Sequence, residues 1–386
     1  ELYKMYMSYK DPANSDKLYQ KQADGTYLDV SSEAGILNFG LGVSASIADF
    51  NNDGWEDIYV SNDFSVPDFF YVNNQDGTFT ERLKEVTKQT SFYGMGTDAA
   101  DVNNDGLTDL FQVDMAAQDN RRQKANMASM NPDIFWSTVN SGFHYQYMYN
   151  SLQLNRGIVD SLPVFSNTAW IAGVAATDWS WCPLFVDLDN DGNKDLYVTN
   201  GTRREINNKD YFNELDKLDK AVRKDSSYEL AAKIPEEPID NYVFKNNGNA
   251  TFLPINQSWG LEYVGFSNGA AYADLDNDGD MDLIVNNIDS KSVLFENRTS
   301  QIEPPKYLTI KLKGGPMNTH GLSSKITLTT NEGIQTKLIT TSRGFQSSVE
   351  PLAHFGLGNS APQNLKIEWS DGTIQYVSDL IANSTM

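Results

Sequence analysis

Four short segments of this chain place oxygen-bearing side chains at alternating positions and follow them with a glycine. They read DFNNDG at 49–54, DVNNDG at 101–106, and DLDNDG at both 187–192 and 274–279. Side-chain oxygens at positions 1, 3 and 5 of such a loop converge, and the glycine at position 6 permits a positive φ angle. A backbone carbonyl at position 7 and a carboxylate at position 9 would complete a shell of hard oxygen ligands. This is the ligand chemistry that Ca²⁺ prefers.

We predict that these loops bind Ca²⁺, with roughly three to four ions in the chain. Neither Cys nor His occurs in them, which argues against typical zinc and copper sites. The position 7 residues, Trp55, Leu107, Asn193 and Asp280, are expected to contribute backbone carbonyls. The predicted ligands are Asp49, Asn51, Asp53, Trp55 and Asp57; Asp101, Asn103, Asp105, Leu107 and Asp109; Asp187, Asp189, Asp191, Asn193 and Asp195; and Asp274, Asp276, Asp278, Asp280 and Asp282.

Two other interpretations of the loops are an EF-hand and a metal-free turn. An EF-hand needs a Glu at position 12 and flanking helices, but that position holds Val60, Gln112, Val198 and Val285. The loops could also be metal-free turns that end a strand. That reading is hardest to maintain at 274–282, where five aspartates would repel one another without a cation.

The loops lie within a longer repeated unit of short strands. A Gly-containing segment such as FGLGVSASIADF (39–50) precedes the loop, and a β-branched strand such as DIYVSN (57–62) follows it. Another strand then ends in an Asn-containing turn, as in FFYVNNQDGTFT (69–80). Three to four short strands repeated at roughly 40–50 residues predict β-propeller blades. The longer intervals between the later loops predict insertions at 115–148 and 201–240, the second of them a helical excursion on the surface.

We therefore expect an all-β protein with two parts. Residues 1–300 are predicted to form at least four propeller blades, and residues 301–386 a small antiparallel β domain, with Pro304–Pro305 marking the boundary. Because four blades seldom close a propeller, either degenerate blades lie in the insertions or further blades precede Glu1, and we favour the second interpretation. The predicted strands of the second part lie at 305–314, 324–330, 334–342, 365–370 and 373–379.

The repeats resemble the FG-GAP/VCBS family, calcium-loop β-propellers related to the blades of integrin α-subunits. FGLGVSASIADFNNDGWEDIYVSND (39–63) and GAAYADLDNDGDMDLIVNN (269–287) carry the resemblance. The third unit departs from the pattern, because Trp179 and Trp181 replace small residues in its first strand. The resemblance implies a propeller, which could be part of a seven-bladed ring.

The C-terminal part resembles the ASPIC/UnbV domain through NTHGLSSKITL (318–328), HFGLG (354–358) and EWSDG (368–372). Such domains follow FG-GAP repeats in bacterial surface or secreted proteins, and the whole arrangement looks like that of Bacteroidetes-type bacteria. The resemblance implies an extracytoplasmic location, secreted or on the outer-membrane surface, and a ligand-binding or adhesion role. It supplies no reaction.

Composition limits the function classes. The formal net charge is −22, from 30 basic and 52 acidic residues, which argues against nucleic acid as a partner. No segment approaches the roughly 18 apolar residues of a membrane-spanning helix. Cys182 is the single cysteine, so no intramolecular disulfide can form, and we expect it to be a core residue.

The sequence favours a binding module over an enzyme. The three histidines, His144, His320 and His354, are expected to be structural, and no HExxH or P-loop motif occurs. We predict a noncatalytic, calcium-stabilised module that recognises a glycan or a protein at the cell surface. The alternatives are a calcium-dependent polysaccharide-degrading enzyme and a structural subunit of an outer-membrane complex. Candidate ligand-binding aromatics, which could equally be core residues, are Phe143, Tyr145, Tyr147, Trp179 and Trp181.

Overall fold

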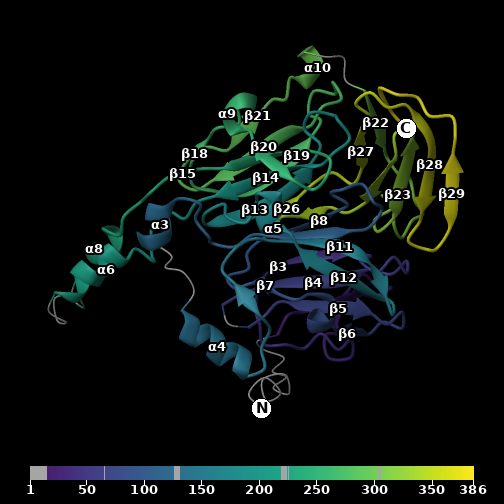
Figure 1. The fold of residues 1–386 in the computed structure, drawn as a ribbon. Coiled ribbons are helices and arrows are strands. Elements are labelled where there is room, and N and C mark those ends of the chain that lie inside the picture. The colour runs from purple at the N-terminus through teal and green to yellow at the C-terminus, as the bar shows by residue number, and fades with distance from the viewer. Residues whose placement is uncertain (1–14, 65, 126–130, 219–223, 225, 303–305) are drawn as a thin grey trace.

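The structure is a computed structural model dominated by β-strands, which confirms the predicted all-β class. Figure 1 shows four successive sheets, running from purple to green, with the yellow C-terminal part lying alongside them. The predicted boundary at Pro304–Pro305 lies outside the described residues. The structure describes residues 15–64, 66–125, 131–218, 224, 226–302 and 306–386.

The four repeat sheets are antiparallel, and their strands follow chain order. In each sheet an Asp loop joins the first strand to the second. The first sheet contains β3 (Leu41–Ala48), β4 (Asp57–Asp63), β5 (Phe69–Asn73) and β6 (Phe79–Glu81), and the second β8 (Thr97–Ala100), β9 (Asp109–Gln112), β11 (Ser151–Val159) and β12 (Leu162–Asn167). The third contains β13 (Ser180–Val186), β14 (Asp195–Asn200), β16 (Tyr242–Asn246) and β17 (Phe252–Pro254), and the fourth β19 (Ser267–Ala273), β20 (Asp282–Asn287) and β21 (Val293–Phe295).

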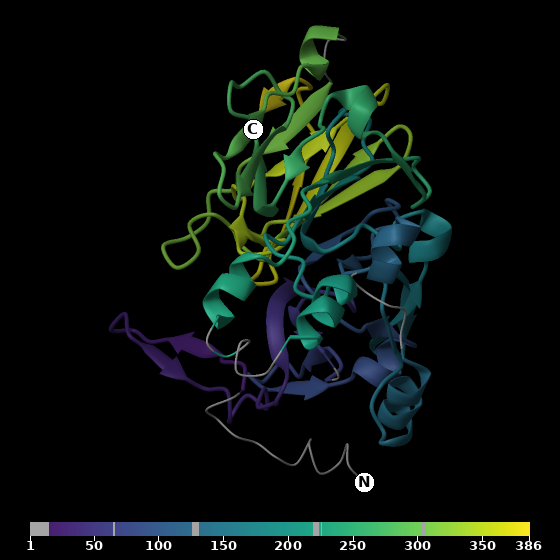
Figure 2. The ribbon, with the colours of Figure 1, turned by 90° about the vertical axis from the view of Figure 1, so that its left-hand side faces the viewer.

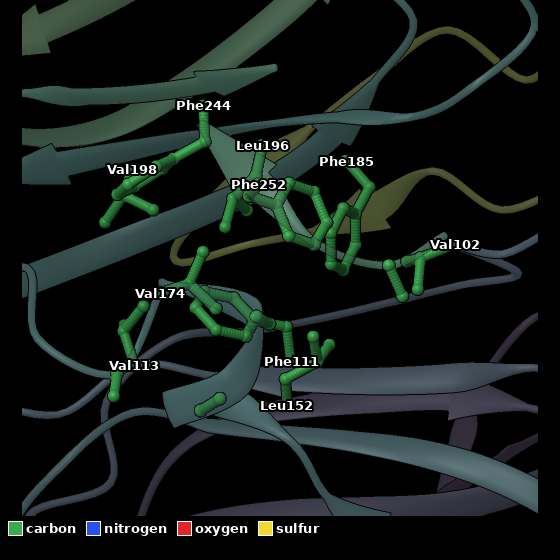
Figure 3. Close-up of a cluster of buried hydrophobic side chains, with 14 of the residues drawn as sticks. Val102, Phe111, Val113, Leu152, Val174, Phe185, Leu196, Val198, Phe244 and Phe252 are labelled. Atoms are coloured by element: carbon green, nitrogen blue, oxygen red, sulfur yellow. The ribbon is translucent and has the colours of Figure 1, made fainter. Parts of the chain in front are cut away.

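The sheets stack face to face, as the blades of a β-propeller do. Strand β14 is buried along its whole length, with Leu196, Tyr197 and Val198 at its centre. Figure 3 shows the core between the second and third sheets, where the rings of Phe111 and Phe185 lie 5.9 Å apart. Cys182 is fully buried in the next core, between the third and fourth sheets.

Two insertions, each between the second and third strands of a repeat sheet, carry four helices in the described part of the chain. The first insertion contains α3 (Asn120–Ala125), α4 (Pro132–Asn140) and β10 (Gln146–Tyr147), and the second α6 (Lys209–Asp216), α8 (Ser227–Ala232) and β15 (Ile239–Asp240). Figure 1 shows α6 and α8 projecting away from the sheets, and in Figure 2, which is seen from that side, they lie in front of the sheets. The remaining elements of this part are β1 (Tyr19–Lys21), β2 (Tyr27–Asp29), α2 (Leu83–Val86), β7 (Thr90–Ser91), α5 (Ala169–Ala172), α9 (Asn256–Trp259), β18 (Val264–Gly265) and α10 (Thr299–Ile302).

The C-terminal part consists of two sheets around one apolar core. One sheet has the strand order β24–β23–β28–β29 and the other β27–β22–β30, in which β22 and β30 pair in parallel. A short hairpin, β25–β26, leaves these sheets and lies against the first strands of the repeats, beside β8 and β19. The bounds are β22 (Tyr307–Ile310), β23 (Lys325–Thr330), β24 (Ile334–Leu338), β25 (Ser342–Arg343), β26 (Ser347–Ser348), β27 (Ala353–Gly356), β28 (Pro362–Glu368), β29 (Ile374–Val377) and β30 (Ser384–Thr385).

Candidate metal centre

All four Asp loops adopt the same backbone conformation. The carboxylate at position 1 accepts hydrogen bonds from the loop's own backbone; in the first loop, Asp49 accepts from the N–H of Asp53 at 3.1 Å and from that of Gly54 at 2.9 Å. The Asn at position 4 has φ between 55° and 63° in every loop, and the Gly at position 6 has φ between 87° and 91°. Asn and Gly are the residues that tolerate such angles, so the local sequence specifies the turn.

The aspartate at position 9 braces each loop against the third strand of its sheet. The buried carboxylate of Asp57 accepts hydrogen bonds from the N–H of Phe50 at 3.2 Å and from the N–H of Asn73 at 3.0 Å. Asp109, Asp195 and Asp282 make the equivalent pairs of contacts. Sequence reasoning assigned position 9 to metal alone and missed this bracing role.

Hydrogen bonds between sheets join the loops into a continuous row. The amide of Asn155, in the second sheet, donates to the carbonyl of Phe50 in the first loop at 2.8 Å. Asn246 and Asn297 repeat this contact with the second and third loops. Asn104 of the second loop also donates to the carbonyl of Gly192 in the third, at 3.0 Å. The position of each loop therefore depends on its neighbour.

The third and fourth loops concentrate the most carboxylates. Oxygen atoms of Asp187, Asp189 and Asp195 lie within 4.8 Å of one another, and so do oxygens of Asp274, Asp276 and Asp278. Burial, together with the charges of Asp191 and Asp189, raises the pKa of Asp187 to about 7. A divalent cation among these oxygens would remove the repulsion that raises this pKa.

The residues of the third loop fit a hard cation. Asp187 is 3% exposed, and among the described residues its Oδ1 atom has no hydrogen-bond partner. A buried carboxylate oxygen without a partner is costly unless an ion or a donor satisfies it. The buried Oδ1 of Asp280, in the fourth loop, has no partner in the described part of the chain either. The first two loops have Asn51 and Asn103 at position 3, so they offer fewer negative charges.

A lysine competes for the third loop. The Nζ of Lys245, on β16, contacts the carboxylate of Asp189 and lies 2.9 Å from Oδ2 of Asp191. An ion that used these carboxylates would have to displace the amine from them. The sequence offered little sign of this contact, because Lys245 lies more than fifty residues after the loop and its proximity follows from the pairing of β14 with β16.

The C-terminal part packs directly against the row of loops. His354 Nε2 lies 2.7 Å from Oδ1 of Asn190, and the N–H of Gly358 donates to the Asn190 carbonyl at 2.8 Å. A Cβ atom at Gly356 would lie 2.1 Å from Oδ2 of Asp187, so this close approach requires glycine. Lys325 donates to Oδ1 of Asn52 at 2.7 Å. The HFGLG segment is thus a contact surface for the third loop.

The five aromatic candidates for ligand binding differ in exposure and in surroundings. Tyr145 is 44% exposed, and Phe143 and Tyr147 are half-buried beside it in the chain. Trp179 is buried in the core between the second and third sheets. Trp181 is half-buried and packs against Phe345 of the β25–β26 hairpin, with ring centroids 5.0 Å apart.

Sequence reasoning missed the rings that surround Tyr147. Its ring lies 5.2 Å from Phe135 and 5.9 Å from Tyr149, and Tyr149 lies 5.6 Å from Trp170. Trp170 and Trp136 are 66% and 54% exposed. We call Phe135, Trp136, Tyr145, Tyr147, Tyr149 and Trp170 the aromatic strip. The Asn131–Pro132 pair is typical of the start of a helix. From this pair the sequence could have indicated that Phe135 and Trp136 lie on one helix, α4.

Family models match both parts of the chain. The model for the FG-GAP-like repeat matches residues 49–111 and 230–285, and the model named ASPIC and UnbV matches residues 314–386. The chain carries FG-GAP-like repeats and an ASPIC and UnbV domain. The first FG-GAP-like match begins at Asp49, the first position of the first Asp loop.

The FG-GAP-like repeats and the ASPIC and UnbV domain together align with curated relatives. Cartilage acidic protein 1 of Mus musculus is 24% identical over 369 residues, covering 93% of this chain and 46% of the relative. The Homo sapiens protein of the same name is 23% identical, with coverages of 93% and 45%. The chain therefore spans about half the length of the curated relatives it matches.

Two solved structures are similar over most of the chain. The V. cholerae biofilm matrix protein Bap1 aligns with a TM-score of 0.34 at 10% identity, covering 95% of this chain and 54% of that one. An Agrocybe aegerita lectin that recognises non-reducing terminal N-acetylglucosamine aligns with a TM-score of 0.34 at 12% identity, with coverages of 95% and 88%. Within the described residues, no helix is long and apolar enough to cross a membrane.

Proposed function

We propose that the chain is a calcium-stabilised, noncatalytic binding module of an extracellular protein, recognising a glycan or another protein. The buried, unpartnered Oδ1 of Asp187 within its carboxylate cluster carries the calcium part of this proposal. The FG-GAP-like repeats and the homology to cartilage acidic protein support an extracellular binding role. We further propose that the repeats occupy residues 1–300 and the ASPIC and UnbV domain residues 301–386.

Calcium would act here as a structural staple. The row of loops lies where the four sheets meet the C-terminal domain, so ions in the loops would stabilise both the turns and that contact. A chain with one cysteine cannot use an intramolecular disulfide for this purpose. Extracellular modules bind Ca²⁺ with dissociation constants of roughly 10⁻⁴–10⁻³ M, which only an external compartment would saturate.

Metal analysis tests the calcium part. At dialysis equilibrium with about 10 mM Ca²⁺, the protein should hold roughly three to four Ca²⁺ per chain above the concentration of the bath. The carboxylate clusters around Asp187 and Asp274 should account for the most tightly held ions. A protein that binds no Ca²⁺ at this equilibrium would refute the structural role of calcium.

The aromatic strip supports the binding part. Exposed Trp and Tyr rings next to one another are typical of surfaces that bind other molecules, because each ring offers a large apolar face and a polar group. Replacing Tyr145 or Tyr147 with Ala should leave the melting temperature unchanged while reducing retention on a ligand identified from a glycan array or a pull-down. A loss of folding in both variants would instead show that these rings are core residues.

A further inference from the structure

A cleft of about 660 Å³ lies between the first Asp loop and the C-terminal domain. Ile47 and Trp55 line the side formed by the first repeat sheet, and Lys366 and Trp369 line the opposite side. Small-molecule sites in proteins are typically clefts of about 300–1,000 Å³. The cleft is therefore large enough for a ligand, and it lies away from the carboxylate clusters of the third and fourth loops.

The side chain of Trp55 has no role in the calcium coordination predicted for its loop. It stands at position 7, where a calcium loop uses only the backbone carbonyl, and the other loops place Leu107, Asn193 and Asp280 there. Its indole is 47% exposed and lines the cleft, and Ile47 beside it is 45% exposed. An indole left half-exposed in a concave site offers a flat apolar face to a ligand.

Charged groups of both signs line the opposite side. Lys366 and Glu368 form an ion pair with 2.7 Å between Nζ and Oε1, and both groups are about one-third exposed. Lys325, also in the cleft, donates to Asn52 at 2.7 Å. A purely apolar ligand would desolvate these charges without replacing their hydrogen bonds. A polyanion would meet the carboxylates of the cleft and a chain of net charge −22.

We propose that this cleft binds a carbohydrate chain, with one sugar ring stacked on Trp55 and its hydroxyl groups hydrogen-bonded by Lys366 and Glu368. A sugar ring combines an apolar C–H face with hydroxyls at its edge, which matches an indole beside charged donors and acceptors. The ion pair can accept and donate these bonds while both of its charges stay partly solvated.

Calcium should organise this site, and this step rests on the proposed function. The N–H of Trp55 donates to Oδ1 of Asp53 at 2.9 Å, so Trp55 is part of the first loop's hydrogen-bond frame. An ion bound through the Trp55 carbonyl would restrict the orientation of its indole. Carbohydrate binding in the cleft should therefore weaken when Ca²⁺ is removed.

Affinity electrophoresis in native gels tests the site. The gels contain a mixed-linkage β-glucan, a xylan, a galactomannan or a dextran, with and without Ca²⁺. We expect at least one polysaccharide to retard the wild-type protein in Ca²⁺. Trp55→Ala should weaken that retardation about tenfold, whereas Trp55→Phe should keep most of it because a flat ring remains. Tyr228→Ala, on the projecting helix α8 and 87% exposed, is the matched control and should be retarded like the wild type.

Melting curves and Ca²⁺ titrations of the same variants distinguish a failure of the carbohydrate site from a failure of the calcium part of the proposed function. Trp55→Ala should melt and bind Ca²⁺ like the wild type, since its backbone carbonyl remains. Retardation of Trp55→Ala equal to that of the wild type, or no retardation by any of the four polysaccharides, would overturn the carbohydrate cleft. If Trp55→Ala abolishes retardation but Ca²⁺ stabilises nothing, the cleft stands and the calcium part of the proposed function fails.

Discussion

Arg343 of the C-terminal domain forms a bidentate ion pair with Asp98, on the first strand of the second repeat sheet. The Nη2–Oδ2 distance is 2.6 Å, and Asp98 is 1% exposed. Arg343 also donates to the carbonyl of Phe185 in the third sheet and to the hydroxyl of Tyr272 in the fourth, both at 3.3 Å. One guanidinium thus joins three repeats to the C-terminal domain.

Removing one member of this pair should destabilise the protein strongly. Arg343→Met would leave the Asp98 carboxylate buried without its counter-charge, so the free energy of unfolding should fall by about 3–5 kcal/mol. Urea denaturation measures the change. The exposed pair Lys311–Glu350 provides the control, and Lys311→Met should cost less than about 1 kcal/mol. Equal effects of the two variants would show that the buried pair does not join the domains.

The fourth loop should bind calcium through Asp278. Asp278→Asn removes one charge from the Asp274 cluster, so it should lower the bound metal by one ion. The associated loss of stabilisation should be roughly 2–3 kcal/mol at a hundredfold excess of Ca²⁺ over the dissociation constant. Asp76→Asn is the matched control, because Asp76 is exposed in a hairpin turn where it accepts from Thr78. Calorimetric titration would contradict this role if both variants bound as many ions as the wild type.

Lys245 should weaken calcium binding at the third loop. Its amine contacts Asp189 and Asp191, and Lys245→Gln removes the competing charge. We expect the variant to bind Ca²⁺ at this loop roughly tenfold more tightly, which corresponds to about 1.4 kcal/mol. Lys291→Gln changes the net charge equally at an exposed site and should leave the affinities unchanged. Weaker binding by Lys245→Gln would mean that the lysine supports the site.

His144 should make stability depend on pH. Burial, together with the charges of Lys84 and Lys88, lowers its pKa to about 4. Its Nε2 lies 3.1 Å from Oγ1 of Thr87, which ties the first insertion to the end of α2. Between about pH 6.5 and pH 4, the imidazole of the unfolded chain, with a pKa near 6.5, binds a proton, whereas that of the folded protein stays uncharged. The His144 contribution is therefore present above pH 6.5 and is lost as the pH falls through this window.

Comparing His144→Gln with the wild type isolates this effect. The difference between their unfolding free energies should change by on the order of 2 kcal/mol between pH 7 and pH 4.5, measured by urea denaturation. The exposed His320 supplies the control, since His320→Gln should preserve the pH profile of the wild type. An unchanged profile in His144→Gln would contradict the buried, uncharged state of this imidazole.

Local sequence predicted the repeated features of the fold. The Asn–Asp–Gly pattern specifies the positive φ angles of the loops, and the β-branched runs specify strands such as β4 and β14. The Asn within or just after each third strand was visible in the sequence, although the contacts of Asn155, Asn246 and Asn297 with the preceding loop were not. That contact depends on how two sheets stack.

Contacts between distant segments could not be predicted in the same way. Arg343 and Asp98 lie 245 positions apart, and no local pattern indicates their pairing. Trp179 and Trp181 belong to the same sequence segment, yet one is buried between sheets while the other packs against a hairpin of the C-terminal domain. Their surroundings follow from the tertiary arrangement of sheets and domain.

A thermal melt tests the calcium-stapled row of loops most directly. The protein is melted in about 1 mM Ca²⁺, in about 1 mM Mg²⁺ and in EDTA, with a metal count on each sample. We predict that EDTA lowers the melting temperature by roughly 10 °C, that Mg²⁺ restores little of the loss, and that roughly three to four Ca²⁺ accompany the stable form. Identical melting in all three conditions, with no bound metal, would show that the Asp loops are only turns and contradict the account.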